Sequence, residues 1–140
     1  MCKRFRSLLR SKKGISGTVS AVFGILIAAF LMVAGINVCH AINEYSLLND
    51  FANQLIQTAA DEGCTDCNKL DNRYQELCDS CGIVPTSCTF TANYFDSSEK
   101  KVQYGDTITV TMTLDTEMDF CELPLHFTIE KTAKSQQYWK

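Results

Sequence analysis

Cysteine is the residue of this 140-residue sequence with the most chemistry to offer, because it occurs eight times. Six cysteines follow residue 63, as two Cys-x-x-Cys pairs and two single positions: Cys64, Cys67, Cys78, Cys81, Cys88 and Cys121. Two chemistries suit such thiols, namely disulfide bonds in an exported domain and a four-thiolate zinc site. The segment between the pairs, residues 68–77, is shorter than the roughly 15–20 residues usual in that zinc pattern.

Helical geometry bears on the choice. If residues 68–77 are helical, Cys67 and Cys78 lie about 16 Å apart, so the two pairs can neither share one metal ion nor bond to each other. Each pair is then expected to find partners elsewhere, with Cys88 and Cys121 as candidates. Structural disulfides are favoured, while a metal site and reduced core cysteines stay open. The acids Glu62 and Asp66 disfavour a thiolate-based redox role for the first pair.

No other catalytic pattern is present in the sequence. It has no glycine-rich phosphate loop, no Gly-x-Ser-x-Gly and no His-Glu-x-x-His. The only two histidines, His40 and His126, are far apart in the chain. We therefore expect no enzymatic activity, no cofactor and no small-molecule substrate.

Charge is divided sharply along the chain. Six basic residues precede Gly14, and the first acidic residue is Glu44. From Gly14 onward the remaining seven Lys and Arg face all sixteen Asp and Glu, a net charge of −9. Because such an acidic part repels phosphate backbones, a nucleic-acid partner is not expected.

The elements that must carry these residues begin with residues 15–38, which include no charged side chain. As a helix they are about 36 Å long, against a hydrocarbon core of about 30 Å. This predicts a transmembrane helix; a cleaved signal sequence is less favoured because its apolar stretch is normally about 7–15 residues. Basic residues beside a first membrane helix stay in the cytoplasm. The expected topology is single-pass in the cell membrane, with residues 1–14 as a cytoplasmic leader and the C-terminal domain extracellular.

Small residues recur along one side of the predicted membrane helix. They could let another helix approach closely, or they could reflect the general frequency of small residues in such helices. The candidate helix-packing residues are Ser16, Gly17, Ser20, Ala21, Gly24 and Ala28.

Residues 39–63 continue as an amphipathic helix that Gly63 ends. Residues 64–88 form a cysteine-rich segment with a short helix at 69–81, and residues 89–140 a β-meander. Its strands are expected at 89–95, 107–114 and 125–132, with Pro124 in a connection. The predicted fold is α+β: a long N-terminal helix packed on a small antiparallel sheet through Leu48 and Leu55 among others.

Several short stretches of the chain are similar to a known family. They are Gly14-Ile15 after the basic leader; residues 50–55 with Ala59 and Gly63; residues 74–77 with Gly82, Ile83 and Pro85; and residues 123–125, 132–135 and 138–140. Together they resemble type IV pilin-like proteins, and more closely the TadE-like pseudopilins of Gram-positive bacteria. Val19 stands where pilins usually carry glutamate, and Lys134 where the family often has glycine.

This resemblance implies a pilin-like fold and a non-catalytic envelope subunit of a Tad-like pilus, secretion or conjugation apparatus. Its partners would be the membrane and other pilin-like or secretion-apparatus subunits, including further copies of itself. Gly14-Ile15 would be a leader-cleavage site. The alternative from the residues alone is a membrane-anchored extracellular cysteine-rich binding module whose thiols hold a metal or whose domain captures a ligand.

Overall fold

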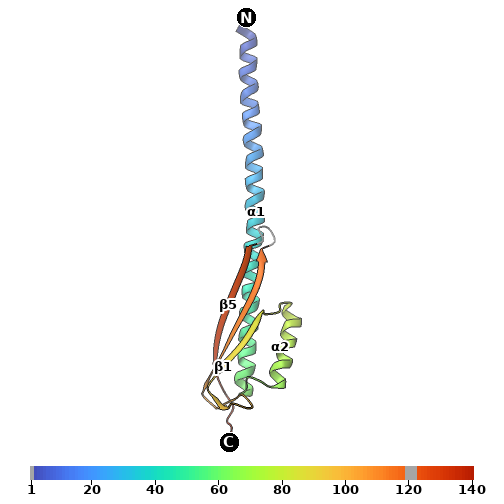
Figure 1. The fold of residues 1–140 in the computed structure, drawn as a ribbon. Helices are drawn as coiled ribbons and strands as arrows, with labels where there is room; N and C mark the ends of the chain where they lie inside the picture. Colours follow the sequence, from blue (N-terminus) through green and yellow to red (C-terminus); the bar gives the residue numbers. More distant parts are fainter. Residues whose placement is uncertain (1, 119–122) are drawn as a thin grey trace. The chain divides into compact units, whose positions relative to one another are not determined.

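The computed structural model describes residues 2–118 and 123–140. Contacts divide the chain into two compact units at the boundary between Cys39 and His40. The first unit consists of helix α1 up to that boundary; α1 as a whole spans Cys2–Glu62 (Figure 1). It begins before residue 15, where the sequence predicted its start, because the basic leader is made largely of good helix formers and has no proline.

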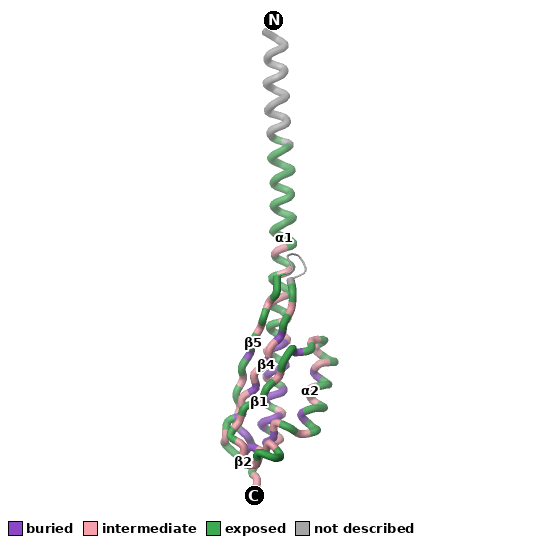
Figure 2. The backbone as a smooth tube through the Cα atoms, viewed as in Figure 1, coloured by how far each residue is buried: buried purple, intermediate pink, exposed green. Residues whose placement is uncertain are grey.

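Most of the described residues of this first unit are exposed (Figure 2). Ile25, Leu26 and Leu31 are all at least 60% exposed. Large exposed apolar surfaces of this kind mark sites of interaction with a membrane or with another protein. The helix is long and apolar enough to cross a membrane, which confirms that part of the prediction.

The second unit begins with the rest of α1 and continues into α2, Asn68–Cys81. Gly63 ends α1 with a left-handed φ of 62°, and its N–H donates to the Ala59 carbonyl at 2.9 Å. Gly82 ends α2 in the same way, with φ 67° and an N–H bond to Cys78 at 3.0 Å. Both glycines terminate the helices where the sequence predicted, since a left-handed residue satisfies a free carbonyl of the last turn.

Five strands follow: β1 Ser87–Ala92, β2 Tyr94–Asp96, β3 Lys101–Val102, β4 Thr107–Met118 and β5 Leu123–Lys134. Three form an antiparallel sheet in the order β1-β4-β5, while β2 and β3 pair in a separate small hairpin. The single strand predicted at 89–95 is therefore wrong. It is interrupted at Asn93, and its two halves join different sheets.

Pro124 was also placed wrongly, because it lies inside β5 opposite Glu117 rather than in a connection. β5 is the last strand of its sheet. An edge strand tolerates proline, since one of its sides needs no ladder hydrogen bonds.

The core of the second unit lies between α1 and the sheet. Buried residues of α1 (Leu48, Phe51, Ala52, Leu55, Ile56 and Ala59) share one cluster with Ile108, Val110, Met112 and Leu114 of β4 and Ile129 of β5. Leu70 and Leu77 add α2 to this cluster. The predicted packing of helix on sheet is confirmed, and the α+β fold with it.

Candidate functional site

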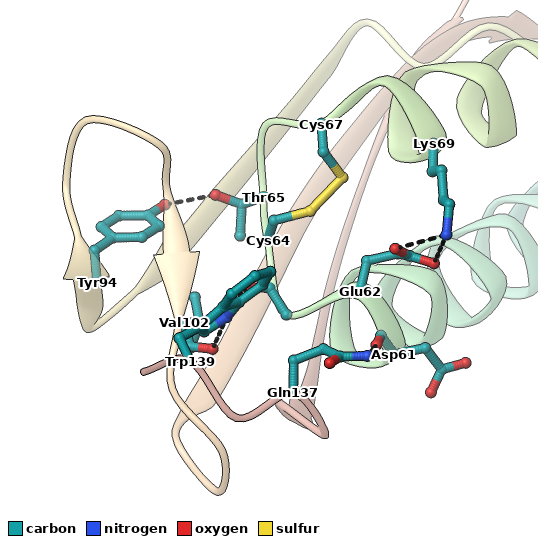
Figure 3. The surroundings of a disulfide bond; sticks show 11 residues. Asp61, Glu62, Cys64, Thr65, Cys67, Lys69, Tyr94, Val102, Gln137 and Trp139 are labelled. Carbon is teal, nitrogen blue, oxygen red and sulfur yellow. Dashed lines mark hydrogen bonds and ion pairs between the residues drawn. A yellow bond between two sulfur atoms is a disulfide. The ribbon is translucent and has the colours of Figure 1, made fainter.

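The disulfide between Cys64 and Cys67 lies in the corner that joins α1 to α2 (Figure 3). The Cα atoms of the two cysteines are 6.3 Å apart, which is within the range a disulfide bridges. Cys67 is the N-cap residue of α2, and its carbonyl accepts the Asp71 N–H at 3.1 Å. The bond therefore closes the turn that begins at Gly63.

The expectation that both Cys-x-x-Cys pairs find partners elsewhere is wrong for this pair. The distance between the two pairs does not limit the distance within one pair. Residues 63–67 are not helical, and the turn brings the two cysteines of the first pair together.

The C-terminal segment holds this corner from the other side (Figure 3). The Trp139 indole N–H lies 3.1 Å from the Val102 carbonyl and 3.3 Å from that of Gly63. The Gln137 side-chain amide donates to the Asp61 carbonyl at 2.8 Å. Lys101 places its ammonium 4.6 Å from the centre of the Trp139 ring, a cation–π contact. The last residues of the chain thus pack on the Gly63 turn, from which they are distant in the sequence.

Charged side chains surround a hollow of about 480 Å³ beside the disulfide. Lys69 pairs with Glu62 at 2.9 Å, and Lys101 pairs with Glu99. Asp66 also lines the hollow, so three acidic and two basic side chains surround it, an excess of one negative charge.

Three further cysteines gather at the other end of α2. Cys78, Cys81 and Cys88 are half-buried thiols packed against the core together with Tyr74. Burial raises the pKa of Cys88 to about 11, and the neighbouring Cys78 adds to the rise. Burial also raises the pKa of Cys78, although a hydrogen bond with Tyr74 opposes this. The raised pKa values keep the Cys78 and Cys88 thiols neutral near pH 7, so neither has the lowered pKa of a catalytic cysteine.

The described cysteines do not form a metal centre. In residues 2–118 and 123–140, no three His, Cys, Asp or Glu side chains are arranged to hold an ion. The first Cys-x-x-Cys pair precedes α2 and the second lies in its last turn, as the spacing argument required. Cys39 is exposed, and Cys121 lies outside the described residues.

In comparison with known protein families, residues 25–140 match the model of DUF4320, a domain of unknown function. The chain belongs to the DUF4320 family. The DUF4320 match includes the second part of the membrane-length helix, both Cys-x-x-Cys pairs and the C-terminal segment that carries Trp139. No curated protein and no solved structure matches the chain.

The candidate packing residues of this DUF4320 chain lie in the first unit. Gly17, Ser20, Ala21, Gly24 and Ala28 are exposed along α1. A Cβ added at Gly17 or Gly24 would meet nothing within 4 Å, so nothing within the described chain occupies that side of the helix. Gly14 and Ile15 lie within α1, but their side chains and that of Ser16 are outside the described part.

Sequence reasoning missed the C-terminal half of the disulfide corner. Trp139 and Gln137 lie far from Gly63 in the sequence, and no periodic pattern joins them. The usable signal was the single tryptophan of the chain close to its end, because a large aromatic with an N–H donor is usually placed where that donor finds an acceptor.

Proposed function

We propose that this chain is a non-catalytic, pilin-like subunit of a bacterial envelope assembly, in a Tad-like pilus, secretion or conjugation apparatus. One observation carries the proposal. The same helix has exposed apolar side chains on every side between Val19 and Val38 and supplies the central buried stripe of the second unit. Anchor and domain core therefore belong to one helix, and Leu48, Phe51 and Leu55 of its second part are buried in the domain core.

Such a construction suits a component that works by its position in an assembly. A receptor or enzyme tethered to a membrane needs only a flexible linker, whereas α1 continues without interruption to Glu62. One continuous helix, rather than a separate linker, joins the membrane-length segment to the domain. A pilin-like subunit would be built in this way.

The side of the membrane follows from charge and redox chemistry. The basic leader favours a cytoplasmic N-terminus, which puts the acidic domain outside. The Cys64–Cys67 disulfide supports the same orientation, because structural disulfides persist in oxidising compartments and are rare in the cytosol.

Partners would pack on the small-residue side of the membrane helix. Gly17, Ala21, Gly24 and Ala28 allow another backbone to approach, and in lipid close van der Waals packing is what favours helix association. Val19 gives no carboxylate where pilins usually carry one, so the charge pairing of pilin assembly is missing. A minor or accessory subunit fits this helix better than a major filament subunit.

Intact mass and N-terminal sequencing of protein extracted from membranes test the proposal. We expect the membrane helix and the domain to remain in one chain. A start at Ile15 would add processing by a prepilin-type peptidase, and a start at Met1 or Cys2 would show an unprocessed anchored subunit. A start at Cys39 or Ile42 would contradict the proposal, because the domain would then be secreted without the membrane-length part of α1.

A further inference from the structure

We propose that Cys78 and Cys88 form a second disulfide that joins α2 to β1, with Cys81 left as a thiol. The inference rests on the export of the domain in the proposed function, since it needs an oxidising compartment. It assigns the first crosslink between the α2 segment and the sheet.

The α2 partner is fixed by helical geometry. Tyr74, Leu77, Cys78 and Cys81 are spaced so that they share one side of α2. That side faces the core, because Leu77 is 2% exposed and the Tyr74 ring contacts that of Phe51 at a centroid distance of 5.4 Å. Cys78 therefore points into the space between α2, α1 and the sheet.

The β1 partner is fixed by strand register. Cys88 lies directly opposite Met112, which is fully buried. Opposite residues of an antiparallel pair point to the same face of the sheet, so Cys88 points to the face that the helices cover. The connection from α2 to β1 is short, residues 82–86, which keeps both thiols at the same end of the unit.

Proximity selects Cys78 rather than Cys81 as the partner of Cys88. The Cys78 thiol acts electrostatically on Cys88, and both thiols act on the Tyr74 hydroxyl, so the three groups form one cluster. Cys81 interacts electrostatically with Cys78, and its sulfur lies 3.9 Å from the Ser80 hydroxyl oxygen. Cys64 and Cys67 already bond to each other and are not available.

Formation of the bond requires an external disulfide as oxidant, such as the oxidised dithiol site of an envelope oxidoreductase. The Cys78 thiolate attacks one sulfur of that disulfide, releases the other as a thiolate and leaves a mixed disulfide. Cys88, after losing its proton, then displaces the oxidant sulfur from Cys78. Two protons and two electrons leave the protein, and the oxidant ends as a dithiol.

The bond would close a loop from Cys78 to Cys88 and so restrict the unfolded chain. In the full-length protein in detergent, we expect removal of this bond by Cys88→Ser to lower the urea midpoint of unfolding by about 1–3 M. Cys81→Ser is the matched control, because it removes a thiol from the same side of α2 without removing the bond.

Peptide mapping decides the pairing. Full-length protein is alkylated at acidic pH as the producing cells are opened, and then digested without reduction at aspartate. Cleavage before Asp66 separates Cys64 from Cys67, and cleavage before Asp79 separates Cys78 from Cys81 and Cys88. We expect a linked pair of peptides whose fragmentation joins Cys78 to Cys88, with Cys81 alkylated. The link should be absent in Cys88→Ser and present in Cys81→Ser.

The same digest separates two kinds of failure. If Cys64 and Cys67 are linked but Cys78 and Cys88 are both alkylated, this inference is wrong and export stands. A link that joins Cys78 or Cys88 to Cys81, Cys39 or Cys121 also overturns it. If all of these cysteines, including Cys64 and Cys67, are alkylated, the domain is in a reducing compartment, and both this inference and the proposed orientation fail.

Discussion

Leu55→Ala tests whether the membrane-connected helix is the core of the domain. Leu55 is 1% exposed and belongs to the cluster that joins α1 to β4 and β5. Truncation of a buried leucine to alanine costs about 2–5 kcal/mol, through lost transfer free energy and the cavity left behind. Domains of this size are stable by about 5–15 kcal/mol, so the loss is a large part of the total.

Urea unfolding of the full-length protein in detergent micelles measures this effect, with Trp139 as the reporter. Trp139 is the only tryptophan, and it packs on the Gly63 turn of the same unit. With a urea dependence of about 1–3 kcal/mol per molar, the midpoint should fall by about 1–3 M. Gln57→Ala, an exposed position on the same helix, is the control and should change stability by less than about 0.5 kcal/mol. An equal midpoint for Leu55→Ala and the control would refute packing of α1 on the sheet.

Three further predictions use the same unfolding assay or simple thiol chemistry. Gly63→Ala should destabilise the domain by more than Gly82→Ala. Both glycines have a positive φ, which costs a residue with a side chain about 1–2 kcal/mol, but only at Gly63 would the new Cβ meet Gln137 Cβ, at 2.5 Å. Equal losses of stability would contradict packing of the C-terminal segment on Gly63. Replacing both Cys64 and Cys67 by alanine should cost only about 2 kcal/mol, because the loop they close is very short, and a larger loss would mean that the bond holds more than its own turn. In fully reduced protein, Cys88 should be alkylated more slowly than exposed Cys39 at pH 8, since the pKa of Cys88 is raised to about 11. Because the Cys88 thiol loses its proton at a lower pH in the unfolded chain, the free energy of unfolding should fall as pH rises from about 8.5 toward 11. An increase in stability over this range would contradict the prediction.

The sequence predicts those parts of the fold that have a local signal. The charge-free stretch identifies the membrane-length helix, Gly63 and Gly82 identify the helix ends, and alternation in residues 107–114 identifies the central strand of the sheet. The predicted apolar stripe of α1 was too narrow. It named Leu48 and Leu55 but not the buried Phe51 or Ile56, because a helix covered by both a sheet and α2 buries a wider face than one contact requires.

Features that depend on distant pairing were missed. The break at Asn93 arises because β2 pairs with β3 while β1 pairs with β4, a competition that no local pattern records. The hydrogen bonds of Trp139 likewise depend on the path of the last residues, far from Gly63 in the sequence. The Cys64–Cys67 bond joins near neighbours and was missed for another reason, because it depends on the left-handed turn at Gly63.

We propose that the membrane helix packs on partner helices through its small-residue side. The most direct test is photo-crosslinking in membranes of the producing bacterium, with a small diazirine side chain placed at Gly24 in one variant and at Leu26 in another. These positions are about 200° apart around the helix, so one faces the proposed partner and the other faces lipid. The account predicts a protein adduct, with a second copy or another single-pass subunit, from position 24 and none from position 26. Equal adducts from both positions, or lipid adducts alone from position 24, would contradict it.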